Sequence, residues 1–84
     1  MNNPESIKVI NRFYEALDVL VELKLIRGKK TFCDLYDINR RNLWFVKKDP
    51  QSNMFQISWL VHLTRDFGVS AEWILMGKGE MFSK

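Results

Sequence analysis

Cysteine and histidine occur once each among the 84 residues, which is too few for several kinds of functional site. A single cysteine, Cys33, excludes an internal disulfide framework and is typical of a reducing compartment, so we expect a cytoplasmic protein. Zinc requires about four protein or solvent ligands, and Cys33 together with His62 cannot supply them. The sequence therefore predicts no metal centre and no cofactor.

Long hydrophobic runs are also missing. Charged residues interrupt every apolar stretch before it reaches the ~18 residues that a membrane-spanning helix needs, so we expect no membrane partner. Residues 1–5 show no basic region leading into an apolar stretch, which argues against a secretory signal. The sequence has neither strand-like alternation nor an Asn-Gly hairpin turn, and this absence favours an all-α fold.

Signatures of catalysis are equally sparse. Cys33 falls on the inward side of a predicted helix, and a cysteine in such a position is more often a buried core residue than a nucleophile. Gly77-Lys78-Gly79 lacks the spacing of a phosphate-binding loop and is typical of a helix end. We therefore expect neither an enzyme nor a binder of small molecules.

What the sequence does contain is helical spacing of apolar residues along most of its length. A hydrophobic content of 46% is too high for a disordered chain and, at this length, predicts one domain over residues 1–84. We expect five helices, which cover residues 5–26, 29–36, 39–47, 54–67 and 70–76.

Turn and cap residues set the ends of these helices. Asn39 and Ser70 are good N-caps, and Gly68 is a helix stop. Gly28 either ends the first helix or caps the second. Asp37 stands at a turn where a left-handed backbone is needed, a conformation that Asp tolerates.

Two helices have apolar faces whose burial can be predicted. The first helix carries one stripe of Ile7, Ile10, Tyr14, Leu17, Val21 and Leu25 and a second of Val9, Phe13, Ala16, Leu20 and Leu23. So wide a face either covers the core or partly meets a partner. For the fourth helix we expect the buried side chains to be Ile57, Leu60, Val61, Thr64 and Phe67.

Positive charge is concentrated in one segment. Residues 27–48 hold seven basic and two acidic residues, a net charge of +5, whereas residues 1–26 and 49–84 each carry −1. Charge gathered on one element of a small domain is typical of nucleic-acid binders, although a solvated basic surface has the same composition.

The predicted third helix places much of this charge beside aromatic rings. At about 100° per residue, one arc of about 140° holds Arg40, Arg41, Trp44, Phe45 and Lys48. Leu43 and Val46 form a narrow apolar edge outside that arc. Arginines can bind guanine O6 and N7 in the DNA major groove, and aromatic carbon can contact thymine methyls. The alternative is that Trp44 or Phe45 folds back onto a neighbouring helix.

Two segments of the chain carry a further pattern. Residues 29–48 show a small residue, Cys33, then Asp37 four residues later and the apolar Leu43 six residues beyond that. This spacing resembles the helix-turn-helix of the phage-repressor-like (XRE, lambda-repressor-like) family. Residues 67–79 are similar to the closing helix of the same family, and together the resemblance covers about residues 13–82. Asp37 and Cys33 depart from the glycine and alanine that are usual, and the charge of Asp37 would weaken DNA affinity.

The resemblance implies a fold, a function and a set of contact residues. It implies a compact five-helix domain with a helix-turn-helix formed by the second and third helices. The function is that of a sequence-specific transcriptional regulator of the phage-repressor type, with helix 39–47 in the major groove of double-stranded DNA. Base edges would be read by Arg40, Arg41 and Phe45, and phosphates contacted by Asn39, Asn42, Lys29, Lys30, Lys47 and Lys48.

Two further expectations concern partners. Proteins of this type usually bind as homodimers, and the candidate interfaces are the helix-one stripe with Val9, Phe13 and Leu20, or the segment 76–82, which we favour. Met81 and Phe82 have no obvious core of their own in the sequence. The alternative function is a helical protein-interaction module, an antirepressor or adaptor that has lost DNA binding and whose contact surface includes Trp44 and Phe45.

Overall fold

The computed structural model describes residues 3–82 and contains five helices within that range. They are α1 (Pro4–Glu22), α2 (Lys29–Tyr36), α3 (Arg40–Lys48), α4 (Ile57–Phe67) and α5 (Ala71–Met76). Residues 3–82 form no strand, only an isolated bridge between Val69 and Phe82. The predicted all-α class and the five helices are therefore confirmed. The ends of the predicted domain, residues 1–2 and 83–84, lie outside the described residues.

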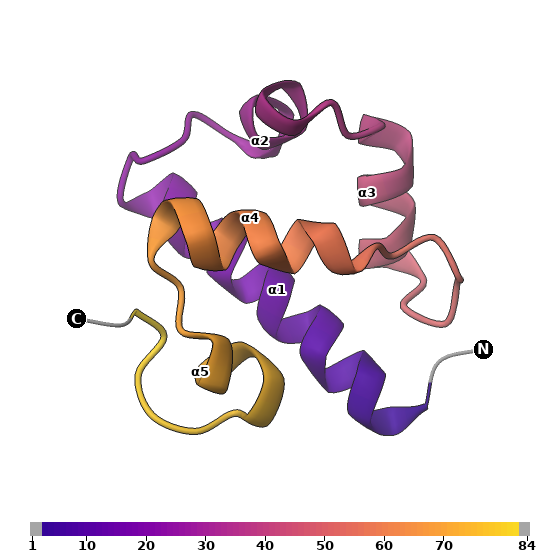
Figure 1. Ribbon diagram of the computed structural model, residues 1–84. Helices are drawn as coiled ribbons and strands as arrows, with labels where there is room; N and C mark the ends of the chain where they lie inside the picture. The colour runs from indigo at the N-terminus through magenta and orange to yellow at the C-terminus, as the bar shows by residue number, and fades with distance from the viewer. Residues whose placement is uncertain (1–2, 83–84) are drawn as a thin grey trace.

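The helices enclose one core, with α1 and α4 at its centre. Figure 1 shows α2 and α3 on one side of α4 and α5 on the other. Phe13 of α1 stands in the middle of an aromatic cluster, with ring centroids 5.0–5.9 Å from those of Tyr14, Phe32, Phe55 and Trp59. The pairs with Tyr14, Phe32 and Phe55 are edge-on, and such ring pairs add to the stabilisation from burying large apolar surfaces.

Local chemistry fixes the helix ends much as expected. Asn39 Oδ1 accepts a hydrogen bond from the Asn42 N–H at 3.1 Å, and Ser70 Oγ accepts one from Trp73 N–H at 3.2 Å. Asp37 ends α2 in the left-handed region with φ 53°, and Gly68 ends α4 with φ 71°. Gly28 is the N-cap of α2, which settles its role in favour of the second helix.

The predicted end of the first helix, at about Ile26, is wrong by four residues. Lys24 takes a left-handed conformation with φ 63°, its N–H bonds to the Val21 carbonyl at 3.0 Å, and the Leu25 N–H bonds to the Leu20 carbonyl at 3.0 Å. This pair of backbone hydrogen bonds is a common way for a helix to end, and the residue in the position of Lys24 is usually glycine. The turn lets Ile26 enter the core while Leu23 and Leu25 stay exposed.

The predicted inward face of the fourth helix is partly wrong as well, and the helix begins at Ile57, three residues later than expected. Trp59, Leu60 and Leu63 are buried, whereas Ile57 is 73% exposed and Val61 45% exposed. Both sides of α4 are apolar, and the side with the larger tryptophan is the one that joins the aromatic cluster. Ile57 and Val61 are consequently left on the surface.

The side chains named for the candidate dimer interfaces are more buried than expected. Phe13 and Leu20 are fully buried, so neither is exposed for contact with a second copy. Met81 and Phe82 are half-buried against the core, contrary to the expectation that they lack one. The Ser70 N–H donates to the Met81 carbonyl at 2.7 Å, which holds this segment beside α5.

Within residues 3–82 no helix is both long and apolar enough to span a bilayer.

Candidate functional site

The position of α3 depends on its contacts with α1 and α2. Three residues, Asp37 to Asn39, connect α2 to α3, and the left-handed Asp37 turns the chain between them. The buried Tyr14 hydroxyl of α1 donates to the Leu43 carbonyl of α3 at 2.5 Å. Burial raises the pKa of Tyr14 above its usual range, so the hydroxyl stays protonated and remains a donor. Leu43 and Val46 face the core, which turns the opposite side of α3 toward solvent.

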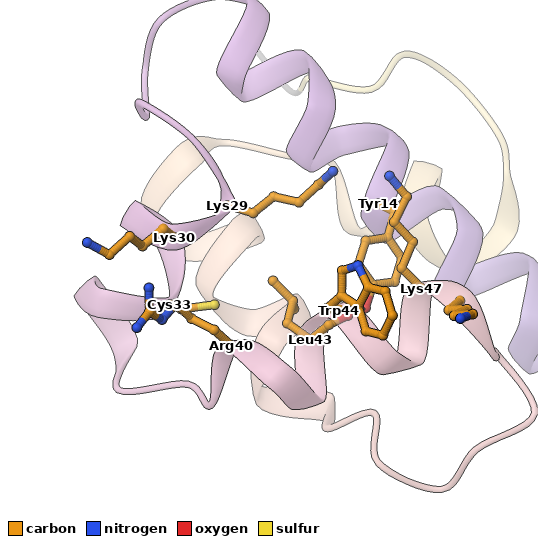
Figure 2. A pocket seen from close by; sticks show the side chains of 9 residues that line it. Tyr14, Lys29, Lys30, Cys33, Arg40, Leu43, Trp44 and Lys47 are labelled. Atoms are coloured by element: carbon orange, nitrogen blue, oxygen red, sulfur yellow. Dashed lines mark hydrogen bonds between the residues drawn. The ribbon is translucent and has the colours of Figure 1, made fainter.

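A groove of about 660 Å³ lies where α1, α2 and α3 meet. Its lining includes five basic side chains and no acidic one, namely Lys29, Lys30, Arg40, Lys47 and Lys48. Tyr14, Cys33 and Leu43 supply the more apolar parts, and Trp44 forms a wall (Figure 2). The groove therefore suits an anion that also presents apolar surface.

Two lysine ammonium groups lie close together at one side of this groove. In Figure 2 the side chains of Lys29 and Lys47 extend toward the same region, from α2 and α3 respectively. The close approach of the Lys29 ammonium, and its positive charge, lower the pKa of Lys47. Burial opposes the charge on Lys29, but its contacts with Lys47 and Asp18 together raise its pKa. Lys29 Nζ lies 3.0 Å from Asp18 Oδ1, so this cation is already partly neutralised. An anion between the two ammonium groups would relieve their repulsion.

The outward side of α3 carries the arginines. Within residues 3–82 neither Arg40 nor Arg41 forms an ion pair, and both are exposed. In Figure 2 Arg40 extends back toward α2, close to Cys33. Arg41 lines a second, shallower hollow beside α3 together with Ile38, Asn39, Arg40 and Trp44. Unpaired guanidinium groups on one helix face are available to a ligand.

The structure brings most of the predicted site residues together. Five of them line the first groove, and Asn39 and Arg41 line the hollow next to it, with Arg40 shared by both. Asn42 is half-buried and Phe45 is 39% exposed, and both lie on α3 outside these two hollows. Asn39 Oδ1 caps α3 by accepting the Asn42 N–H, and the side-chain amide nitrogen of Asn39 is the donor that suits a phosphate oxygen.

Trp44 was not among the predicted DNA contacts, yet it is the more exposed of the two aromatic side chains of α3. Its indole is 61% exposed, compared with 39% for Phe45, and it lines both hollows. Lys48 Nζ lies 5.0 Å from the ring centroid, a cation–π contact that holds a second cation over this surface. The place of Trp44 in the outward arc, between Arg40 and Lys48, is the sequence signal that identifies it.

A separate polar contact fastens α2 to α4. The Tyr36 hydroxyl donates to Asp66 Oδ2 at 2.7 Å, and the Tyr36 ring stacks on His62 with centroids 3.8 Å apart. Hydrogen bonds donated by Arg65, the larger effect, and by Tyr36 lower the pKa of the Asp66 carboxyl group to about 2. Burial and the neighbouring Arg65 lower the pKa of His62, which favours its neutral form.

Residues with reactive or metal-binding side chains lie apart. Cys33 is 2% exposed at the edge of the groove, and burial raises the pKa of its thiol. Among residues 3–82 no three His, Cys, Asp or Glu side chains are grouped closely enough to hold a metal ion.

Comparison with known proteins finds no family model, no curated protein and no solved structure that matches this chain.

Proposed function

We propose that the protein is a sequence-specific regulator of transcription that acts in the cytoplasm and binds double-stranded DNA through α2 and α3. In this proposal the two helices form a helix-turn-helix, and α3 enters the major groove as it does in phage-type repressors. The observation that carries the proposal is the basic groove of five cations beside the unpaired Arg41 and the exposed Trp44.

The arrangement supports one set of side chains that contacts phosphates and another that contacts bases. Lys29 and Lys30 begin α2, Lys47 and Lys48 end α3, and all four line the same groove between these helices. Such side chains, together with the N-terminal amides of α2, suit the phosphates of a DNA strand. Arg41 is exposed in the first turn of α3, lines the hollow beside Trp44 and suits a guanine edge. The direction of Arg40, back toward α2, favours a phosphate over a base.

Selecting one DNA site in a genome requires more than one copy of the protein. A helix of nine residues reaches only a few base pairs. We therefore propose that two copies bind half-sites about 34 Å apart, one helical turn of DNA.

A fluorescence anisotropy titration with labelled duplex DNA tests the proposal. Random duplex at low salt measures the phosphate contacts, and duplexes selected from a random pool measure base reading. The matched control is Lys78→Ala, which removes the same charge from the loop after α5. Saturable binding that Lys47→Ala weakens and Lys78→Ala leaves unchanged supports the proposal. Failure of the chain to bind any duplex at low salt contradicts it.

A second candidate function is a protein-interaction module that keeps the helical fold without binding DNA. The exposure of Trp44 and the acidic Asp37 at the start of the α2–α3 connection favour it. The same titration separates the two functions, because an interaction module would leave random and selected duplexes equally unbound.

A further inference from the structure

The groove where α1, α2 and α3 meet has the size and the lining of a small-molecule site. Its volume of about 660 Å³ falls within the range of about 300–1,000 Å³ that ligand pockets occupy. Three buried side chains, Tyr14, Cys33 and Leu43, form what we call the floor of the groove. The Tyr14 hydroxyl donates its proton to the Leu43 carbonyl, so the floor offers mainly apolar surface. The DNA-binding proposal uses the basic side chains around this floor and gives the floor itself no role.

Two ammonium groups from different helices meet at one side of the groove. The side chains of Lys29 and Lys47 extend toward the same region (Figure 2), and the close approach of Lys29 lowers the pKa of Lys47. Asp18, 3.0 Å from Lys29, neutralises only part of this charge. A phosphate monoester carries a charge of about −1.5 to −2 at pH 7 and three acceptor oxygens, so one group can accept from both lysines. A carboxylate has one charge and two oxygens and would balance the pair less completely.

The rest of the lining suits a planar ring beside that phosphate. Trp44 lines the groove with an indole that is largely exposed. Arg40 lines it too, and its side chain extends back toward α2, close to Cys33 (Figure 2). Indole and guanidinium planes both stack on aromatic rings, and apolar surface accepts the edge of such a ring. An aliphatic anion would contact the floor but would make no use of the two planar groups.

We infer that the groove binds a small aromatic phosphate, a molecule that joins a phosphate group to a planar ring as a nucleotide does. The phosphate lies between Lys29 and Lys47, and the ring lies against Trp44. The sequence predicted no small-molecule ligand, because the packing of three helices that forms the groove is not visible in it.

The ligand and DNA would exclude each other from this surface. Five of the side chains proposed to contact DNA line the groove, so one cannot bind while the other holds them. This exclusion rests on the proposed function, whereas the binding of the ligand does not.

Calorimetric titration of the full chain without DNA, at low salt, tests the site with four probes. Phenyl phosphate and adenosine 5′-monophosphate carry both a ring and a phosphate, inorganic phosphate carries only the anion, and phenol carries only the ring. We expect the first two to bind with one molecule per chain, inorganic phosphate to bind at least about 10-fold more weakly, and phenol to show no binding. Tighter binding of the nucleotide than of phenyl phosphate identifies a nucleotide as the source, and the reverse order identifies a smaller aryl phosphate.

Three substitutions at exposed positions of α3 locate the bound probe. Lys47→Ala should lower the association constants of phenyl phosphate and inorganic phosphate alike by about 10-fold. Trp44→Ala should lower that of phenyl phosphate by about 10-fold and leave that of inorganic phosphate unchanged. The matched control is Arg41→Ala, which removes a cation from the neighbouring hollow and not from the groove, and it should leave every probe unchanged. Circular dichroism checks that each variant keeps its helicity.

The inference is overturned if neither aromatic phosphate binds, if inorganic phosphate binds as tightly as they do, or if Arg41→Ala weakens binding as much as Lys47→Ala. An anisotropy competition with labelled random duplex separates these results from the fate of the proposed function. Displacement of bound duplex by phenyl phosphate supports both proposals, and duplex that stays bound at saturating phenyl phosphate contradicts the shared surface. A chain that binds phenyl phosphate but no duplex refutes only the DNA proposal. A chain that binds duplex but neither aromatic phosphate refutes only the ligand site.

Discussion

The salt dependence of DNA binding can be worked out from the basic groove. Four lysines lie at the ends of α2 and α3, and each phosphate contact contributes about −0.9 to the slope of log K against log salt. The lysines alone give a slope of about −3.6 for one copy, and Arg40, whose direction favours a phosphate, extends it to about −4.5. A fourfold rise in salt should then lower affinity for random duplex by about 10²- to 10³-fold.

Single substitutions measure how much each side chain contributes to that slope. Lys47→Ala should flatten the slope by about 0.9 and weaken binding on all sequences alike. Lys29→Ala should flatten it less, because Asp18 at 3.0 Å already neutralises part of that charge. Lys78→Ala should leave the slope unchanged. Anisotropy titrations in a sodium chloride series measure all four proteins, and a slope near zero, or equal effects of Lys47→Ala and Lys78→Ala, would refute the assignment of the groove to phosphates.

Three further predictions follow from individual side chains. Arg41→Ala should cost about 1–3 kcal/mol on a selected site and relax the preference at one base pair, whereas equal losses on selected and random duplex would make Arg41 a phosphate contact. Asp37→Asn keeps a residue that tolerates φ 53° and removes a negative charge beside α3, so affinity for every duplex should rise by a few-fold; unchanged or weaker binding contradicts this. Since its pKa is lowered from 3.8 to about 2, Asp66 stabilises the fold above about pH 4 and loses that effect as the pH falls toward 2. Asp66→Asn should lower the unfolding midpoint at neutral pH and flatten its decline over that acid range, as thermal unfolding by circular dichroism can measure.

Helix number, order and most caps followed from the sequence because they depend on neighbours in the chain. The bounds of α2 were predicted at both ends, and the caps Asn39 and Ser70 bond the amides three residues later. Asp37 was placed correctly in a left-handed turn. Each of these features is decided by a few adjacent residues, so the local pattern was sufficient.

The errors arose where distant parts of the chain decide the outcome. The apolar spacing of α1 continues through Leu25, but the helix ends at a left-handed Lys24, which allows Ile26 to enter the core. On α4 the sequence offered two apolar sides, and only the aromatic cluster around Phe13 shows that Trp59 faces inward. Periodicity cannot rank two apolar faces without knowledge of what packs against them.

The candidate site shows the same division. Charge and helical spacing predicted the residues that now line the groove, since both are properties of the sequence. Two relations were not predictable. The bond from Lys29 to Asp18 joins α2 to α1, and the contact of Lys48 with Trp44 depends on side-chain conformation.

An amide chemical-shift titration with duplex DNA tests the central claim most directly, because it reports each backbone position separately. Binding through α2 and α3 predicts that the largest shifts fall at the start of α2 and along α3, around Lys29, Arg41 and Trp44. Residues of α4 and α5 should shift little. Shifts that centre on α4 and α5, or no shifts at low salt, would contradict the claim that the basic face of α3 binds DNA.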